Sequence, residues 1–410
     1  MSTVYSNGNV KTKLLEPTTY NSNVSAEWRI TEPCLPTLRL IDLGTSVSSG
    51  DSDYNKLIGA YGLIKSVFLY QGQLLLDGCP NIQHYMAFKQ YNKSNSVNRN
   101  LKQHLVRNKM GFGISQINTI ADTRGPTNQS GTNASKTALG HVHLNEFLPL
   151  LDKLNVLDPA VFKNLRLVVE FTTDSQTFAT TPPATFTTAR PRLIMDVLAP
   201  GAFNANPTAV QWNALEQDRF VSPAIAKTAV QSIVSNFKLN GFNSKLVSRI
   251  LICKSYQDKT KNVDGATVNG FGPFASLAQF KEVVQVAVNG SQLLPRNGVE
   301  GPHRMLSMLH DTWGECNTLP GGSSCDLVTT QQADPDTKIA TPLLKYQGQQ
   351  SYFGCFLNQR VKDLQITYTR QGQIDTGAIT PYNEALDCLV YGEVSKTLYI
   401  QGNVINIVYN

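Results

Sequence analysis

Short runs of β-branched and aromatic residues alternate along most of the chain with clusters of Gly, Pro, Asn or Ser. Closely spaced runs of this kind are typical of β-sandwiches and barrels, in which each strand soon turns back. We therefore expect an all-β fold with strands at Ala26–Thr31, Thr37–Leu43, Ile64–Tyr70, Leu165–Thr172, Pro191–Val197, Ser232–Leu239, Leu246–Lys254, Val283–Val288, Val361–Tyr368, Leu386–Val394 and Thr397–Tyr409.

Several strands of the first half have a counterpart in the second half, in the same order. The pairs are Glu27–Leu43 with Asn236–Cys253, Ser66–Gly78 with Val284–Gly298, Asn164–Phe171 with Asp363–Tyr368, and Pro191–Val197 with Leu386–Val394. Their shared order and their separation of about 200 residues favour a duplicated unit. The sequence thus predicts two similar β units in tandem.

A few segments have helical periodicity. Asn206 and Pro207 supply an N-cap and a first helical position before an apolar stripe. We expect this helix to link the two units, with Trp212 and Leu215 as its docking face. His143–Leu154, limited or kinked by Pro149, and His303–Trp313 complete the expected helices.

Charge is sparse and unevenly placed. Charged residues make up 16% of the chain, and the formal net charge is +6. The segment from Gly78 to Ala121 has no acidic residue and contains six basic ones: Lys89, Lys93, Arg99, Lys102, Arg107 and Lys109. These side chains are suited either to nucleic-acid phosphates or to a subunit contact, and the sequence leaves both interpretations open.

Candidate catalytic chemistry is scarce. The chain has no GxxxxGK[ST], HExxH or GxSxG motif, and we expect neither an enzyme nor a cofactor. His141 and His143, with Glu146, form one compact group that could approach a metal, although surface or interface histidines are the more ordinary interpretation. The seven cysteines include no CxxC and predict free, buried thiols; only Cys316 and Cys325 are close enough to suggest a bridge.

No apolar run reaches the roughly 18 residues that span a bilayer. The first residues also lack the charged-then-apolar layout of a signal peptide. We therefore expect a protein with no transmembrane segment, made in its host cell without such a signal.

The layout resembles one family, the double-jelly-roll major capsid proteins of tailless icosahedral DNA viruses. This family includes adenovirus-type hexons and the coat proteins of virophages and polinton-like elements. The segments that carry the resemblance are GLIKSVFLYQGQLL (Gly62–Leu75), HLNEFLPLLDKLNVLDPAVFKNLRLVVEF (His143–Phe171), AVQWNALEQDRFVSPA (Ala209–Ala224) and NFKLNGFNSKLVSRILI (Asn236–Ile252).

The resemblance implies two eight-stranded antiparallel jelly rolls, with a few short helices in loops and linker, and a homotrimer that tiles an icosahedral shell. It also implies a place in the virion, with neighbouring capsomers, minor capsid or penton proteins and packaged DNA as partners. The expected organisation is an N-terminal arm at 1–25, a first roll at 26–202, a linker with helix at 203–231 and a second roll at 232–410.

Two other functions remain open at this stage. One is a tandem β-sandwich that binds carbohydrate, which requires exposed aromatic side chains along a groove. The other is a viral coat protein with one shell domain and one protruding domain. Two equal rolls would separate the main interpretation from the latter.

Overall fold

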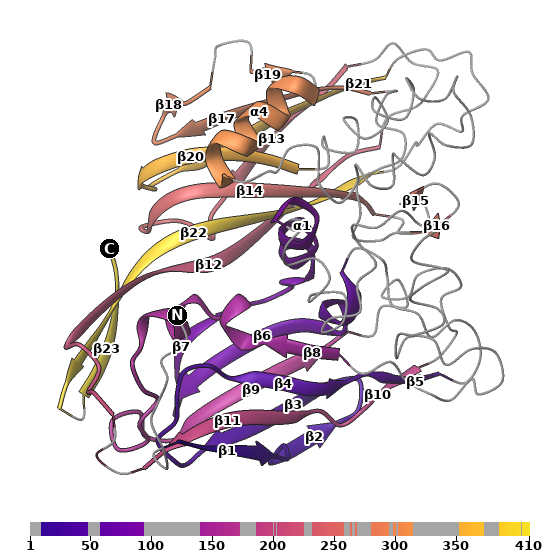
Figure 1. The fold of residues 1–410 in the computed structure, drawn as a ribbon. Coiled ribbons are helices and arrows are strands. Elements are labelled where there is room, and N and C mark those ends of the chain that lie inside the picture. Colours follow the sequence, from indigo (N-terminus) through magenta and orange to yellow (C-terminus); the bar gives the residue numbers. More distant parts are fainter. Residues whose placement is uncertain are drawn as a thin grey trace.

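The computed structural model of the 410-residue chain shows two stacked β units with helices between and beside them (Figure 1). It describes residues 10–47, 58–93, 140–172, 186–199, 201, 203–224, 232–257, 263–264, 267–268, 280–294, 298–300, 302–314, 352–372, 385–402 and 404–410.

The first roll consists of two antiparallel sheets. One has the strand order β1-β11-β4-β8, and the other has the order β2-β3-β9-β6-β7. The strand bounds are β1 Val10–Leu15, β2 Thr19–Asn21, β3 Ser25–Ile30, β4 Arg39–Leu43, β6 Ile64–Gln71, β7 Leu74–Cys79, β8 Gly140–His143, β9 Leu165–Phe171 and β11 Arg192–Leu198.

The second roll repeats this arrangement. Its sheets have the orders β12-β22-β14-β20, with β23 also paired to β22, and β13-β21-β17-β18, with β19 also paired to β17. The bounds are β12 Ala209–Ser222, β13 Ser232–Leu239, β14 Leu246–Tyr256, β17 Phe280–Val288, β18 Ser291–Gln292, β19 Val299–Glu300, β20 Tyr352–Arg360, β21 Leu364–Gly372, β22 Leu386–Gln401 and β23 Val404–Tyr409.

The two rolls therefore have one topology. Read in chain order, β1, β4, β8 and β11 take the same sheet positions as β12, β14, β20 and β22, and β3, β6, β7 and β9 match β13, β17, β18 and β21. Each of the four sequence pairs falls on equivalent strands, which confirms both the repeat and the expected fold of tandem jelly rolls. The glycine turn shared by one pair is also matched, because Gly72 and Gly290 both adopt a positive φ.

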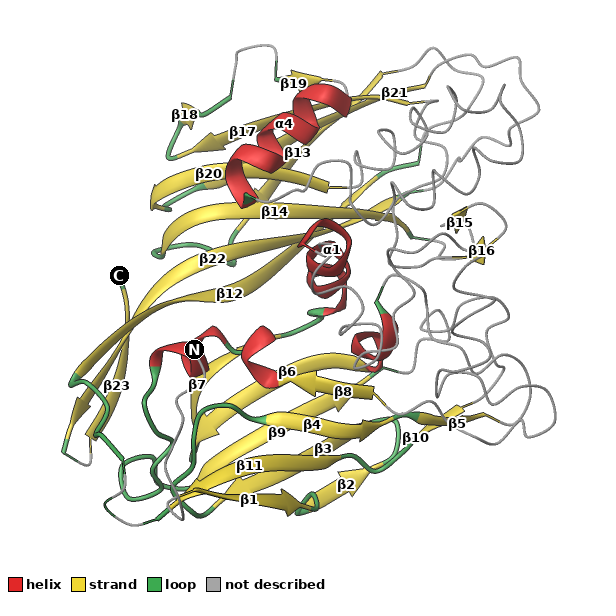
Figure 2. Ribbon diagram, viewed as in Figure 1, coloured by secondary structure: helices red, strands yellow, loops and turns green. Residues whose placement is uncertain are grey.

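Helices are few and short (Figure 2). Helix α1 (Gln83–Lys93) follows β7, and α4 (Pro302–Trp313) follows β19, so in the described part of the chain each roll carries one α-helix at the same point of its topology. The expected helix at His303–Trp313 is confirmed, whereas α1 was not expected. The remaining elements are η1 (Gly59–Leu63), η2 (Leu144–Glu146), η3 (Pro149–Lys153) and two small two-stranded sheets, β5 (Thr45–Val47) with β10 (Phe186–Thr188) and β15 (Val263–Asp264) with β16 (Thr267–Val268).

Three sequence expectations need correction. The predicted helix at His143–Leu154 is two 3₁₀ segments, η2 and η3, because Pro149 cannot continue an α-helix. The expected strand Thr397–Tyr409 is a hairpin that turns at Gly402, whose φ is +60°. The expected N-terminal arm contains β1, which pairs with β11 along its whole length, so the first roll already includes Val10.

The predicted linker helix is also wrong. Its residues form β12, which pairs with β22 from Ala209 opposite Tyr399 to Ser222 opposite Leu386. Asn206, the expected N-cap, instead accepts hydrogen bonds from the backbone N–H groups of Asn155 and Val156 in the first roll, at 2.7 and 3.1 Å. The 203–231 segment is thus largely a strand of the second roll that lies against the first.

Candidate structural site at the junction of the two rolls

A three-stranded extension of the second roll joins it to the first roll. It consists of the first half of β12, the second half of β22 and β23, and it is called the ribbon below (Figure 1). Even-numbered residues share one face of β12. On that face Phe220 belongs to the core of the second roll, whereas Val210 and Trp212 belong to a core cluster that includes the first roll. One sheet face therefore covers two cores.

The two residues proposed from sequence to pack between the rolls lie in this shared cluster. Trp212 is 2% exposed and Leu215 is 5% exposed. Strand β12 contacts β7 and η3 of the first roll, and Leu76 and Leu150 from these elements are in the same cluster. Both residues lie on a strand and not on the helix that the sequence suggested, and their role in holding the two rolls together stays a prediction.

A charged group is buried beside this apolar contact. Asp77 of β7 is 1% exposed and accepts hydrogen bonds from the backbone N–H groups of Leu150 (2.8 Å) and Gly78 (3.0 Å). Burial raises the pKa of Asp77 to about 6, although these hydrogen bonds and the positive charge of Lys396 lower it. Lys396 lies on β22, so the charges of the two rolls meet here.

Lys396 is held by a carboxylate of β12. Its Nζ lies 2.8 Å from Glu216 of β12, which Lys245 also contacts, and both ammonium groups lie over the ring of Tyr409. Burial alone would raise the pKa of Glu216, but the attraction of Lys396 and Lys245 lowers it below its ordinary value. The buried ammonium group of Lys396 and the half-buried one of Lys245 therefore share a carboxylate partner, as a low-dielectric site requires.

This arrangement predicts that protonation of Asp77 stabilises the folded protein. Because its folded-state pKa lies above the ordinary value of 3.8, this stability is present at low pH and is lost as the pH rises through about 6. As the pH falls from 7 to 5, we expect the free energy of unfolding of the parent to rise by about 1.4 kcal/mol relative to that of the Asp77→Asn variant, as measured by urea unfolding. The exposed substitution Asp311→Asn is the matched control, and a parallel pH dependence for parent and Asp77→Asn would contradict the assignment.

Aromatic residues of α1 also contact the second roll at this junction. Tyr85 lies 5.7 Å from Tyr391 of β22 and 5.9 Å from Trp313 of α4, measured between ring centroids. Phe88 packs against Trp313 and against Tyr352 of β20. The hydroxyl of Tyr391 also donates a hydrogen bond to the Asn81 carbonyl at 2.5 Å. Helix α1 of the first roll is thereby seated on the sheet of the second.

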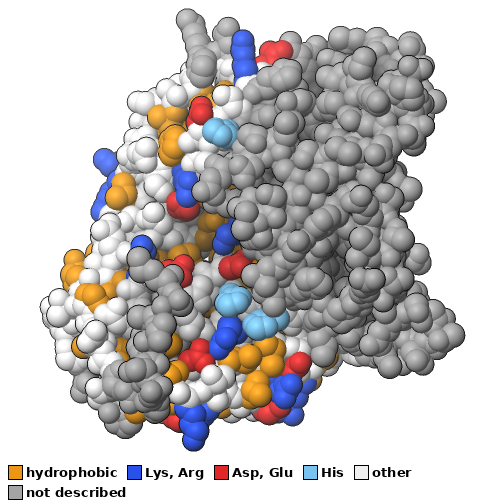
Figure 3. Space-filling model, in the orientation of Figure 1, with side chains coloured by type: hydrophobic (Ala, Val, Ile, Leu, Met, Phe, Trp, Pro, Cys, Tyr) orange, Lys and Arg blue, Asp and Glu red, His pale blue; other side chains and the backbone are white. Residues whose placement is uncertain are grey.

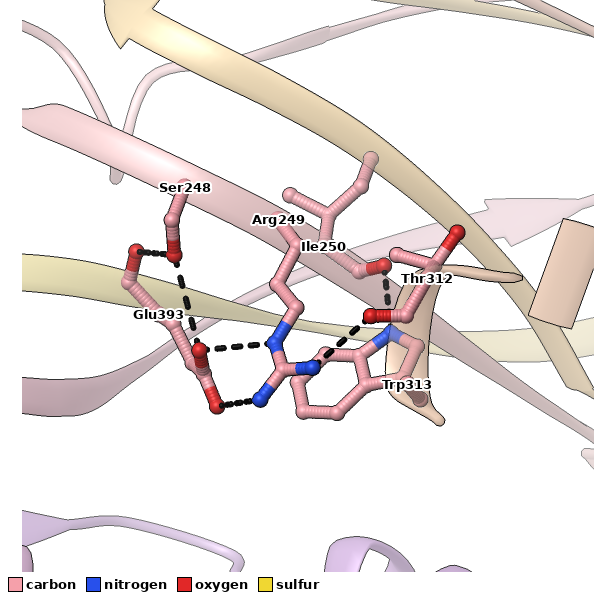
Figure 4. Close-up of polar contacts among 6 residues, drawn as sticks. All are labelled: Ser248, Arg249, Ile250, Thr312, Trp313 and Glu393. Atoms are coloured by element: carbon pink, nitrogen blue, oxygen red, sulfur yellow. Dashed lines mark hydrogen bonds and ion pairs between the residues drawn. The ribbon is translucent and has the colours of Figure 1, made fainter. Parts of the chain in front are cut away.

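Helix α4 is fastened to the same sheet by Arg249 (Figure 4). Arg249 makes a two-pronged contact with Glu393, at 2.7 Å for each nitrogen, and donates to the Thr312 carbonyl at 2.7 Å. Its guanidinium lies 4.2 Å from the centre of the Trp313 ring, and the indole N–H donates to the Ile250 carbonyl at 3.0 Å. One side chain thus ties two strands to the last turn of a helix.

A β-bulge and a glycine make this contact fit. The register of β14 shifts between Val247 and Arg249, so Val247 and Ile250 both face the core of the second roll while Arg249 faces α4. A Cβ at Gly354 would lie 2.7 Å from Trp313, so only glycine leaves room for the indole.

Of the basic stretch, the structure describes only the beginning. Lys89 donates to the Glu146 carbonyl at 3.4 Å, and Lys93 is the last residue of α1. Arg99, Lys102, Arg107 and Lys109 lie outside the described residues, as do Cys316 and Cys325. The function of this stretch stays a prediction.

The histidine group has a geometry of its own. The rings of His141 and His143 are stacked at 5.5 Å, and the Glu146 carboxylate accepts a hydrogen bond from Tyr61 at 2.7 Å. Burial lowers the pKa of both histidines. Across the described ranges, no three His, Cys, Asp or Glu side chains are grouped as metal ligands.

The cysteines, the tryptophans and the described helices test three further expectations from the sequence. The five described cysteines, Cys34, Cys79, Cys253, Cys355 and Cys388, are free and buried, as the sequence predicted for cysteines in general. The three tryptophans, Trp28, Trp212 and Trp313, are at most 2% exposed, so they do not line a sugar-binding groove. Neither described helix has the length and apolar composition needed to cross a membrane.

Sequence reasoning missed the charged residues of the junction. Asp77, Glu216 and Lys396 are far apart along the chain, and so are Arg249 and Glu393. None belongs to a motif. The one available signal is that charge is rare in this sequence, so that a carboxylate inside an apolar strand such as LLLDGC is noticeable.

The similarity of this chain to known proteins lies in its structure. No family model and no curated protein matches the chain. A crystal structure of PBCV-1 VP54, fitted into a cryo-EM reconstruction of the virophage Sputnik, is similar with a TM-score of 0.61 and 11% identity, over 100% of this chain and 99% of that one. The mavirus major capsid protein is similar with a TM-score of 0.56 and 10% identity, over 99% and 92% of the two chains.

The Sputnik virophage structure itself gives a TM-score of 0.55 at 10% identity, over 100% of this chain and 90% of that chain. At such identities the similarity establishes the fold. The chain therefore has, over its whole length, the double-jelly-roll fold found in the mavirus major capsid protein.

Proposed function

We propose that this protein is a major capsid subunit that trimerises into pseudo-hexameric capsomers of an icosahedral viral shell. The observation that carries the proposal is the presence of two rolls of identical strand order, which together match viral capsid proteins from end to end. Three such chains place six equivalent rolls around one axis, and six equivalent neighbours are what a hexagonal tile requires.

The junction supports this function physically. A tile must keep its two rolls in fixed register while many copies come together, and interfaces with packed cores resist continuous deformation. Here the rolls share a core cluster, a buried charge group and an aromatic contact through α1. A sparsely charged chain also limits mutual repulsion between copies in an assembly.

On this proposal the protein resides in the virion, as a homotrimer in contact with neighbouring capsomers and with minor capsid or penton proteins. The basic stretch from Lys89 to Lys109 then either faces packaged DNA or joins subunits. The salt dependence of DNA binding tests the first role, because contacts to phosphate weaken steeply as the salt concentration rises.

Two alternatives are less well supported. A coat protein with one shell domain and one protruding domain requires two unlike units, whereas the two rolls share a topology. A carbohydrate-binding tandem is less well supported because the three tryptophans, which would be its natural sugar contacts, are buried.

The test is the assembly state of the purified chain. Multi-angle light scattering is expected to give a mass near three times 45.1 kDa, with negative-stain images of compact particles of hexagonal outline. The trimer is expected to persist in mild urea, since obligate interfaces are large and apolar. A stable monomer that retains a glycan on an array would contradict the proposal.

A further inference from the structure

Strand β23 is an open edge of the ribbon. It pairs with β22 on one side, and among the described strands none pairs with its other side. Val404 is 67% exposed, and Val408 and Tyr409 are about 40% exposed, while Ile405 and Ile407 pack against the shared core cluster. The surface around this strand shows hydrophobic and uncharged side chains (Figure 3).

Such an edge is unusual because, within the described residues, no charge, proline or neighbouring strand protects it. Exposed edge strands attract further strands, and proteins normally prevent this with charge, proline or short length. Several other edges here follow that rule: β1 carries Lys11 and Lys13, β13 carries Lys238, and β2 and β8 are short. Strand β23, with the sequence VINIVY, has no charge and no proline. We therefore expect this edge to be covered in the assembled state.

The backbone of β23 presents a regular row of free groups. The N–H of Asn410 donates to the Ser395 carbonyl at 3.1 Å. Because bonding residues alternate along an antiparallel pair, the even-numbered residues of β23 bond to β22. The N–H and C=O groups of Ile405 and Ile407 then point to the open side, where a strand of another chain can bond to them.

The order of side chains identifies the occupant. Val404, Ile405, Asn406, Ile407 and Val408 read the same in both directions. We propose that β23 pairs antiparallel with β23 of a second copy of this chain, about a two-fold axis at Asn406. As a link between capsomers this contact rests on the proposed function, whereas the strand pairing does not.

In this register every cross-strand pair is matched. Val404 faces Val408 of the second copy on the exposed side, and Ile405 faces Ile407 of the second copy on the side of the core. These isoleucines exchange the backbone hydrogen bonds of the open edge, and the two Asn406 side chains meet at the axis in a non-bonded pair, with Cα atoms about 4.5 Å apart. Like charges on directly opposed residues would repel each other in such a pair. Strand β23 carries no charge, so two copies can approach without this repulsion.

A disulfide test locates the axis. Cysteines introduced by Asn406→Cys in two copies would lie within the Cα range of a disulfide, whereas those introduced by Val404→Cys would be about 14 Å apart. Val404→Cys is the matched control, because residue 404 lies on the same face of the same strand and Val404 is 67% exposed. Under mild oxidation of the full chain, we expect Asn406→Cys to form linked pairs at least about tenfold more than Val404→Cys or the parent, since only position 406 meets the geometric limit.

A charge test follows without any cross-link. Asn406→Lys would place two ammonium groups face to face at the axis and is expected to weaken association between trimers at least about tenfold in sedimentation velocity. Asn213→Lys adds the same charge to the exposed face of β12, away from the axis, and is expected to sediment like the parent.

The outcomes separate the two proposals. Linked pairs of trimers through position 406 support both. Trimers in which positions 406 and 404 cross-link equally, or neither does, overturn the strand pairing and leave the capsid function standing. Specific linkage through position 406 in a chain that is not trimeric supports the pairing and contradicts the trimeric capsomer. Linkage of the Asn406→Cys variant to a different protein assigns the edge to another partner and overturns the inference.

Discussion

Replacing Trp212 with alanine is expected to destabilise the protein by about 3–5 kcal/mol, because it removes a large side chain from a packed core. Trp212 is 2% exposed and lies where β12 of the second roll contacts the first. The cavity cannot easily close, because the residues before and after Trp212 are also paired with β22, and this pairing fixes the backbone of β12. Urea unfolding, followed by far-ultraviolet circular dichroism, measures the loss.

Val221→Ala is the matched control. Val221 is on the same strand but 38% exposed, and exposed substitutions usually change stability by less than about 0.5 kcal/mol. If Trp212→Ala unfolds at the same urea concentration as Val221→Ala, Trp212 does not hold the two rolls together. We also expect the Trp212→Ala variant to separate the unfolding of the two rolls into two transitions in calorimetry, because their shared cluster passes through this residue.

The repeat could be predicted because its signals are local. Alternating apolar residues and a glycine turn mark each strand and hairpin, and both rolls preserve these marks in the same order, as in Ser66–Gly78 and Val284–Gly298. Chain order then fixes which strands are equivalent. No long-range information was required to recognise two similar sandwiches.

The ribbon could not be predicted in this way. The residues around Trp212 include Ala, Leu, Glu and Gln, which are good helix formers, and Asn206-Pro207 resembles a helix start. Fourteen residues of pairing with β22 override this weak local preference. The alternation of Val210, Trp212 and Ala214 was present in the sequence, but only the distant partner strand makes it decisive.

The polar groups of the junction depend even more on distant partners. Asp77 takes its environment from η3 and β22, and Arg249 takes its partners from β22 and α4. A bulge in β14, which no residue type marks, directs Arg249 to this side of the sheet. These contacts become visible only once the sheets are assembled.

Replacing Arg249 with alanine is expected to destabilise the protein by about 2–4 kcal/mol. Breaking a buried ion pair normally costs about 3–5 kcal/mol, and the partial exposure of Arg249 (25%) and Glu393 (15%) reduces this figure. The variant also loses the contact to the Thr312 carbonyl and the stacking on Trp313. Arg190→Ala is the matched control, because its ion pair with Glu16 is more than half exposed and is expected to contribute less than about 1 kcal/mol.

A double variant identifies the cause of this loss. In Arg249→Ala, the Glu393 carboxylate keeps only the Ser248 hydroxyl, at 3.5 Å, as a side-chain partner in the described structure. If this unpaired charge accounts for most of the cost, Arg249→Met combined with Glu393→Leu should be more stable than Arg249→Ala, although it removes both charges. If the double variant is instead the less stable of the two, the contacts to Thr312 and Trp313 carry the energy, and Arg249 acts chiefly as the anchor of α4.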